Sequence, residues 1–159
     1  MKGHIMICIP IMTRDTTDAL QKMAQASAFG DLMEIRLDVM ESFDLSEIIG
    51  AASKPVIFTY RSKEEGGEGS APYEPRVNYL KEAVRLGADY VDVEYAIPPE
   101  HRNRLFENRG HAKLILSKHF CNETPSREKL ADLFKKMVAT GADVVKIVTH
   151  AKTREDNLA

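Results

Sequence analysis

The chain has 159 residues, of which 43% are hydrophobic and 29% are charged, and its net charge is −2. This length suffices for one hydrophobic core, so we expect a single domain over residues 1–159. There is neither a basic surplus nor an apolar run near the ~20 residues of a membrane span, which argues against a nucleic-acid partner and a membrane partner. Cys8 and Cys121 are far apart and form no CxxC pair, so they predict two reduced thiols in a cytoplasmic protein.

Apolar runs and amphipathic segments alternate along the chain. The apolar runs predict strands at residues 4–10, 31–38, 54–61, 88–95 and 112–120, and a sixth around Lys146. The segments between them predict helices at residues 15–28, 45–52, 74–86, 98–108 and 124–140, with the first turn of another at 153–159. The glycine-rich polar stretch at residues 62–72 predicts a mobile loop.

This order of elements is typical of right-handed βαβ units on a parallel sheet. Gly-Ala-Asp occurs at residues 87–89 and again at 141–143, and this separation equals two units of roughly 27 residues. The first strand is followed by neither a dinucleotide-binding nor a P-loop fingerprint. The sequence therefore predicts an α/β protein of the (β/α)8 TIM-barrel type, in which about six βα units are present and two are missing.

The inward face of the predicted sheet becomes polar toward the carboxyl ends of the strands. Side chains two residues apart share a face of a strand, so the faces can be assigned from sequence parity. Five strands contribute charged or polar groups to the same face, at Glu34, Arg36, Arg61, Asp92, Glu94, Ser117, His119 and Lys146. Barrel enzymes build their sites at this end of the sheet, so we expect a site here.

Lys146 stands in the middle of a strand of β-branched residues. Lysine is rarely buried unless its charge has a partner or is lost, so either the amine lies in a site or its head reaches solvent at the strand end. A neutral amine attacks carbonyl groups, and His119 is suited to move the proton that imine chemistry releases. His119, Cys121 and His150 lack a recognised metal-ligand spacing, so we expect neither a metal nor a cofactor.

The other polar residues fit covalent imine catalysis on a ketone or aldehyde. Glu65 is suited to orient the imidazole of His119 or to balance its charge. Arg36 and Arg61 suit an anionic or hydroxyl-rich substrate, and Glu34 is suited to accept hydrogen bonds from hydroxyl groups.

Four motifs occur in a fixed order: Glu34-Ile35-Arg36-Leu37-Asp38, then Phe58-Thr59-Tyr60-Arg61-Ser62 running into Glu65-Gly66-Gly67-Glu68, then Ser117-Lys118-His119, and then Gly141-Ala142-Asp143-Val144-Val145-Lys146-Ile147. Together they resemble the ordered motifs of type I 3-dehydroquinate dehydratase, and the resemblance spans the whole chain. It implies a (β/α)8 barrel, usually dimeric, that acts in the shikimate pathway of aromatic amino-acid biosynthesis. It also implies a metal-free syn dehydration of 3-dehydroquinate to 3-dehydroshikimate.

The resemblance further implies a role for each matched residue. Lys146 matches the Schiff-base lysine, and His119 matches the proton donor and acceptor. Glu65 matches the glutamate that assists this histidine. The positions that match substrate-binding residues of the family are Glu34, Arg36 and Arg61.

The sequence departs from the family pattern in two places. Phe120 and Cys121 follow His119, where the family usually has Asp or Asn and then Phe. The sequence also stops after the sixth strand, whereas the last two βα units of the family carry an arginine for the substrate carboxylate and a serine and glutamine on a closing loop. We therefore expect a C-terminally incomplete member whose open sheet edges are covered by self-association, as in a homodimer.

Two other functions are compatible with the same residues. A class I aldolase-type barrel also uses a lysine imine on a strand, and it would cleave a sugar phosphate by a retro-aldol reaction. Alternatively, a truncated barrel that folds without activity would serve as a scaffold or interaction module and keep these residues as relics.

Overall fold

The computed structural model describes residues 6–158, in which strands and helices alternate as predicted. Residues 4 and 5 of the predicted first strand lie outside the described residues. The strands are β1 (Cys8–Ile11), β2 (Leu32–Arg36), β3 (Val56–Thr59), β4 (Tyr90–Glu94), β5 (Lys113–His119) and β6 (Val144–Val148). The α-helices are α1 (Thr16–Ala26), α2 (Leu45–Ala51), α3 (Tyr73–Arg85), α4 (Pro99–Glu107) and α5 (Arg127–Val138), and the 3₁₀ turns are η1 (Leu37–Val39), η2 (Lys63–Glu65) and η3 (Glu155–Leu158).

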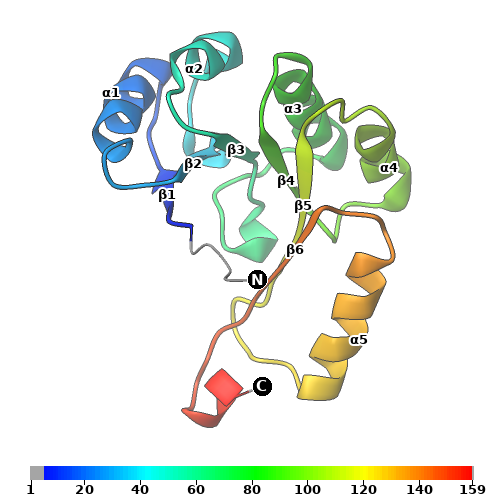
Figure 1. The fold of residues 1–159 in the computed structure, drawn as a ribbon. Coiled ribbons are helices and arrows are strands. Elements are labelled where there is room, and N and C mark those ends of the chain that lie inside the picture. The colour runs from blue at the N-terminus through cyan, green and yellow to red at the C-terminus, as the bar shows by residue number, and fades with distance from the viewer. Residues whose placement is uncertain (1–5, 159) are drawn as a thin grey trace, which may run out of the picture.

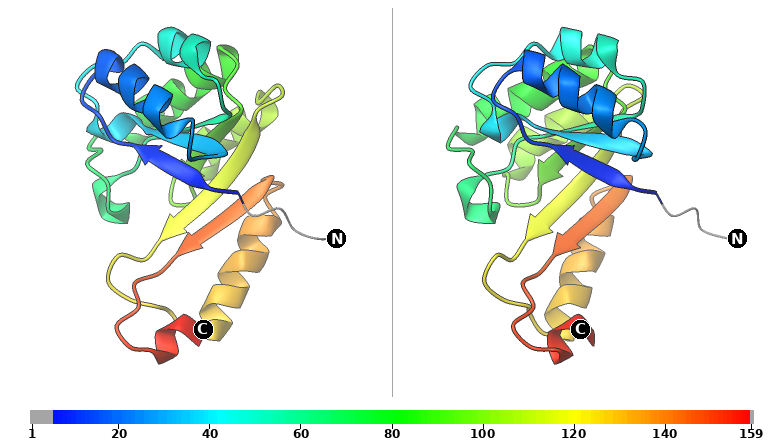
Figure 2. Two further views of the ribbon diagram at one scale, coloured as in Figure 1. Left: turned by 60° about the vertical axis from the view of Figure 1, so that its left-hand side comes forward. Right: turned by 90° about the vertical axis from the view of Figure 1, so that its left-hand side faces the viewer.

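All six strands pair in parallel and in chain order, β1-β2-β3-β4-β5-β6. The sheet curls, and the helices cover its convex side (Figures 1 and 2). Among the described residues, β1 and β6 are the two edge strands. The architecture is a half-barrel of the (β/α)8 type, which confirms the predicted fold class.

Each strand buries one face against the helices and turns the other toward the inside of the curl. Met33, Ile35, Phe58 and Leu114 belong to the large core beneath the helices. A second, smaller cluster occupies the inner face and consists of Leu32, Ile57 and Ile115, with Tyr90 packed against it. The alternation read from the sequence therefore gave the correct faces for β2 and β4.

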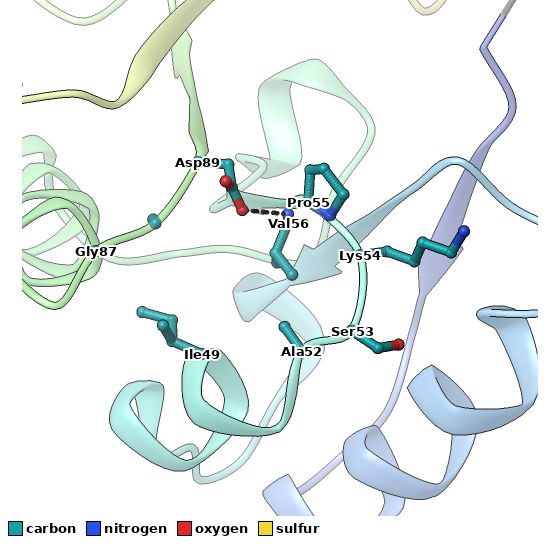
Figure 3. Close-up of a pocket in the computed structure, with 9 residues that line it drawn as sticks. Ile49, Ala52, Ser53, Lys54, Pro55, Val56, Gly87 and Asp89 are labelled. Atoms are coloured by element: carbon teal, nitrogen blue, oxygen red, sulfur yellow. Dashed lines mark hydrogen bonds between the residues drawn. The ribbon is translucent and has the colours of Figure 1, made fainter.

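A recurring aspartate explains the Gly-Ala-Asp repeat. Asp31, Asp89 and Asp143 each directly precede an even-numbered strand, and each binds a backbone amide at the start of the preceding strand. The three donors are the amides of Ile7 (2.7 Å), Val56 (3.0 Å) and Leu114 (2.9 Å). Figure 3 shows the Asp89 carboxylate on the Val56 amide, beside a pocket at the amino ends of the strands. The repeat thus satisfies amides that the parallel ladder leaves without a partner.

Residues 62–72, predicted to form a mobile loop, fold back on themselves instead. The Gly69 amide donates to the Arg61 carbonyl (3.0 Å), and the Lys63 amide donates to the Gly69 carbonyl (3.0 Å). A β-carbon on Gly67 would lie 2.3 Å from the Arg61 carbonyl oxygen. The glycine-rich composition therefore serves close packing of backbone on backbone, and it brings Glu65 into the interior, where 3% of this residue is exposed.

Two predicted strands end two residues earlier than the sequence indicated. β2 ends at Arg36, and Leu37–Val39 form the turn η1, because Asp38 turns back to bind Arg36 and the amide of Arg61. β3 ends at Thr59, so Arg61 lies two residues beyond it. None of the helices within residues 6–158 has the length and apolarity needed to cross a bilayer.

Candidate active site

The polar side chains gather on the inner face, at the carboxyl ends of β2 to β6, as the sequence predicted. Lys146 on β6 is in register with Ser117 on β5, and Ser117 is in register with Glu94 on β4. A residue in register with another on a neighbouring parallel strand points to the same side of the sheet. These three strands therefore direct a lysine, a serine and a glutamate into the curl.

The amine of Lys146 lies between two carboxylates. Its Nζ is 3.6 Å from Asp92 Oδ2 and 4.0 Å from Glu34 Oε1. The Lys146 side chain is 37% exposed, so it is neither fully buried nor a free surface lysine. It opens on a pocket of about 470 Å³ whose lining comes from all six strands: Cys8, Glu34, Ile57, Asp92, Ile115, Val144, Val145, Lys146 and Ile147.

Glu34 and Cys8 complete the surroundings of this amine. Thr59 Oγ1 donates a 2.7 Å hydrogen bond to Glu34 Oε1, which fixes the carboxylate that faces Lys146. Burial, together with the charge of Glu34, raises the pKa of the Cys8 thiol above its ordinary value. Cys8 is therefore kept in the neutral thiol form within this pocket.

Glu65 is held against His119 and Lys118. Its carboxylate accepts from the His119 amide (2.9 Å) and from Lys118 Nζ (2.9 Å), and it lies 3.2 Å from His119 Nδ1. Burial by itself would raise the pKa of Glu65, but the hydrogen bonds from His119 and Lys118 outweigh it and lower that pKa. Glu65 is thus an anion that fixes the imidazole through Nδ1 and leaves Nε2 for other partners.

His119 and Lys146 lie on the same side of the sheet. Lys146 is in register with Ser117, and His119 is two residues further along β5, which is one full pleat. Adjacent strands ~4.8 Å apart and a rise of ~3.3 Å per residue place the two Cα atoms roughly 8 Å apart. His119 is thus one pleat nearer the carboxyl end than the pocket around Lys146.

Arg61 is the centre of a buried ionic cluster. Its Nη1 lies 2.9 Å from Ser117 Oγ and 3.3 Å from Glu94 Oε1, and its Nη2 lies 2.9 Å from Asp92 Oδ1. Only 4% of the Arg61 side chain is exposed. Arg76 on α3 adds a second cation, 2.8 Å from Glu94 Oε2. The cluster fixes the carboxylates of Asp92 and Glu94 beneath the site.

Arg36 faces the site from β2 and is braced by Asp38. Its Nε and Nη2 donate to the two oxygens of Asp38 at 2.9 and 2.7 Å, and 17% of the Arg36 side chain is exposed. The backbone amides of Arg61 and Glu68 also donate to Asp38, each at 3.1 Å. Burial by itself would raise the pKa of Asp38, but the hydrogen bonds from Arg36 and these amides outweigh burial and lower that pKa. A bidentate pair of this kind sets the direction in which the guanidinium points.

The structure brings the six predicted site residues to one end of the curl and adds Arg76, which sequence reasoning missed. Asp92 and Glu94 were placed on the correct face by strand alternation, but nothing in the sequence showed that they contact Lys146 or Arg61. Arg76 was missed because it lies on a helix. The sequence feature that could have indicated its burial is its position on the apolar face of α3, beside Val77 and one turn before Leu80.

The curled parallel sheet, with an amine, an imidazole and several carboxylates at the carboxyl ends of its strands, defines an enzyme of the (β/α)-barrel class. The family model described as type I 3-dehydroquinase matches residues 7–159. The chain therefore belongs to the type I 3-dehydroquinase family, which confirms the resemblance carried by the four sequence motifs.

Similar proteins agree with this assignment. The chain is 38% identical over 157 residues to the chloroplastic bifunctional 3-dehydroquinate dehydratase/shikimate dehydrogenase of Arabidopsis thaliana, covering 95% of this chain and 26% of that protein. It is 32% identical over 158 residues to the 3-dehydroquinate dehydratase of Methanococcus maripaludis strain C5, covering 96% of this chain and 71% of that protein. The Clostridium difficile type I 3-dehydroquinate dehydratase, solved with covalently modified comenic acid, superposes with a TM-score of 0.89 at 27% identity, over 99% of this chain and 68% of that one.

Proposed function

We propose that this chain catalyses the dehydration of 3-dehydroquinate to 3-dehydroshikimate through an imine on Lys146, as a step of the shikimate pathway. The reaction is the one for which its relatives in Arabidopsis and Methanococcus are named. The observation that carries the proposal is the position of Lys146 and His119 on one face of the neighbouring strands β6 and β5, with Glu65 bound to His119. The covalently modified comenic acid in the Clostridium protein supports covalent chemistry in a relative.

Lys146 is the proposed nucleophile. Its Nζ bonds to the ketone carbon of the substrate, the ketone oxygen leaves as water, and the nitrogen keeps one proton and the positive charge. This cation withdraws electrons from the neighbouring carbon and makes its C–H bond acidic. The pocket of about 470 Å³ that Lys146 opens on is lined mainly by aliphatic side chains, which suits the carbon ring of such a substrate.

His119 is the proposed acid and base. It takes the proton from the acidic carbon and delivers a proton to the departing hydroxyl group, which leaves as water from the same side of the ring. Glu65 supports this role because its Oε2 lies 3.2 Å from His119 Nδ1 and fixes the ring. Hydrolysis of the product imine then returns Lys146 to its starting form.

Glu34, Arg36 and Arg61 are the proposed substrate-binding residues, and they are not equally accessible. Arg36 and Glu34 have side chains that are 17% and 15% exposed, so each can present polar atoms to hydroxyl or carboxylate groups. Arg61 is 4% exposed and is engaged by Asp92 and Glu94. Its proposed contribution is therefore the positive charge that it holds beneath the anionic substrate.

We also propose a cytoplasmic protein that associates with a second copy of itself. Two features support this: the free thiols of Cys8 and Cys121, and the edge position of β6 with Val144 and Val148 about 40% and 39% exposed. An edge strand with exposed apolar residues favours pairing with another chain. Mass in solution, measured by light scattering, tests this: a monomer at all concentrations would refute it.

Borohydride trapping tests the proposed function directly. The protein is incubated with 3-dehydroquinate and borohydride, and the mass increase is located by peptide mass spectrometry. We expect an adduct on Lys146 that is lost in Lys146→Ala, together with an ultraviolet signal from the enone product. Lys113→Ala, at the opposite end of β5, is the matched control and retains the adduct. A wild type that forms no adduct would refute the proposal and leave the inactive scaffold.

A further inference from the structure

We propose that Asp92 is the counter-ion of the protonated imine on Lys146, an inference that rests on the proposed function. Asp92 lies on β4, two strands away from Lys146, and its Oδ2 is 3.6 Å from Lys146 Nζ. Formation of the protonated imine places a positive charge on this nitrogen. A carboxylate at this distance stabilises that charge more strongly than the neutral imine.

One oxygen of Asp92 is directed away from the ionic cluster and is available to the imine. Oδ1 accepts a hydrogen bond from Ser117 and pairs with Arg61, which anchors the carboxylate. Oδ2 is buried and, within residues 6–158, has no hydrogen-bond partner. Leaving a buried carboxylate oxygen unpaired is costly, and such groups concentrate at functional sites. A protonated imine at the Lys146 nitrogen would supply the missing donor.

Burial makes Asp92 the stronger of the two anions near this nitrogen. The Asp92 side chain is 1% exposed, whereas that of Glu34, at 4.0 Å, is 15% exposed. Water screens the charge of Glu34 more than that of Asp92. Glu34 also already accepts a bond from Thr59, so its Oε1 is less free than Asp92 Oδ2 to bind the imine proton.

Three other charged or titratable groups near the nitrogen add no negative charge there. Cys8 from β1 lines the same pocket, and burial raises the pKa of its thiol, so it adds no negative charge. Arg61 pairs with Asp92 and offsets part of its field. His119, on the adjacent strand β5, is bound to Glu65 one pleat away. Asp92 and Glu34 are thus the two anions that face the imine, and Asp92 is the closer.

Reductive trapping with a small neutral aldehyde measures this interaction without any need for turnover. Glycolaldehyde forms an imine with Lys146 and releases water, and cyanoborohydride delivers hydride to the carbon of the protonated imine, which gives a stable secondary amine. The trapping rate at Lys146, read by peptide mass spectrometry, therefore follows the amount of protonated imine. The rate falls at high pH as the imine loses its proton.

In Asp92→Asn this alkaline fall should move to lower pH by about 1 unit. A close opposite charge shifts a pKa by about 1–3 units, and the lower end applies here because the Lys146 side chain is 37% exposed to water. Trapping above the midpoint then drops about tenfold. Asp89→Asn, the same substitution at the amino end of β4, should leave the curve unchanged, since the carboxylate of Asp89 binds the Val56 amide at that end of the sheet. Asp92→Glu, which keeps the charge, should restore part of the shift.

An alkaline fall in Asp92→Asn that coincides with that of wild type and Asp89→Asn would overturn the inference. So would a wild type in which glycolaldehyde is never trapped at Lys146. If Asp92→Asn does not fold, Asp92→Ser carries the same expected shift with a smaller side chain. Wild-type protein that traps glycolaldehyde at Lys146 but forms no adduct with 3-dehydroquinate would refute the proposed function, while the pH curve would still decide the role of Asp92.

Discussion

The substitution Glu65→Gln removes one negative charge from a buried carboxylate that Lys118 and His119 bind and that lies 3.7 Å from Arg61 Nη1. Glu65 accepts from Lys118 Nζ and from the His119 amide, each at 2.9 Å, and 1% of its side chain is exposed. Glutamine keeps one acceptor oxygen but places an NH₂ group opposite either the ammonium or the amide. At least one hydrogen bond to a charged group is lost, which costs about 1.5–3 kcal/mol.

This loss is a large share of the stability of a domain this size, which is of the order of 5–15 kcal/mol. For a chain of 159 residues it lowers Tm by roughly 3–12 °C. Urea unfolding followed by circular dichroism measures the change at pH 7. Glu64→Gln is the matched control, because it removes the same charge at the preceding residue, whose side chain is exposed. The control should change stability by less than about 0.5 kcal/mol.

The same variant carries a pH signature whose sign follows from the lowered pKa of Glu65. Burial opposes that lowering, but the bonds from His119 and Lys118 prevail. A carboxyl with a pKa lower in the folded than in the unfolded state stabilises the protein above the unfolded value, near pH 4.3, and loses this contribution as the pH falls further. Wild type should therefore lose stability below about pH 5 more steeply than Glu65→Gln. Equal acid slopes, or equal losses in Glu65→Gln and Glu64→Gln at pH 7, would refute the reasoning.

Three further substitutions test other parts of the structure. His119→Ala should still form the borohydride adduct on Lys146 but turn over roughly 10²–10⁴-fold more slowly, and turnover equal to that of wild type would remove His119 from its proposed role. Asp89→Ala should lower the free energy of unfolding by about 1–3 kcal/mol, because it leaves the Val56 amide without its 3.0 Å partner. Asp89→Asn keeps an acceptor oxygen, so its free energy of unfolding should fall by less. Gly67→Ala should destabilise the protein by more than 1 kcal/mol in thermal unfolding, because its β-carbon would lie 2.3 Å from the Arg61 carbonyl oxygen. Gly50→Ala is the control for this change, since a β-carbon there meets nothing within 4 Å, and it should be neutral or stabilising.

The order of the elements and the faces of the strands could be read from the sequence alone. Met33 and Ile35 lie in the core beneath the helices, and Glu34 lies on the opposite face, as alternation along the strand requires. The alternation of side chains between the two faces is a local property of an extended backbone, so it does not depend on how the neighbouring strands are arranged. The four motifs fixed the family for a related reason, since they mark strand ends whose order along the chain is also their order around the sheet.

Contacts between strands were decided only by the tertiary structure. Glu65 was assigned to a mobile loop, yet the packing of Gly67 against Arg61 carries it inward to His119. The sequence likewise gave no sign that Asp92 and Lys146, 54 positions apart, would lie 3.6 Å from each other. Which side chains meet across the inside of a curled sheet depends on register and curvature, and these arise from the packing of all the helices and strands together.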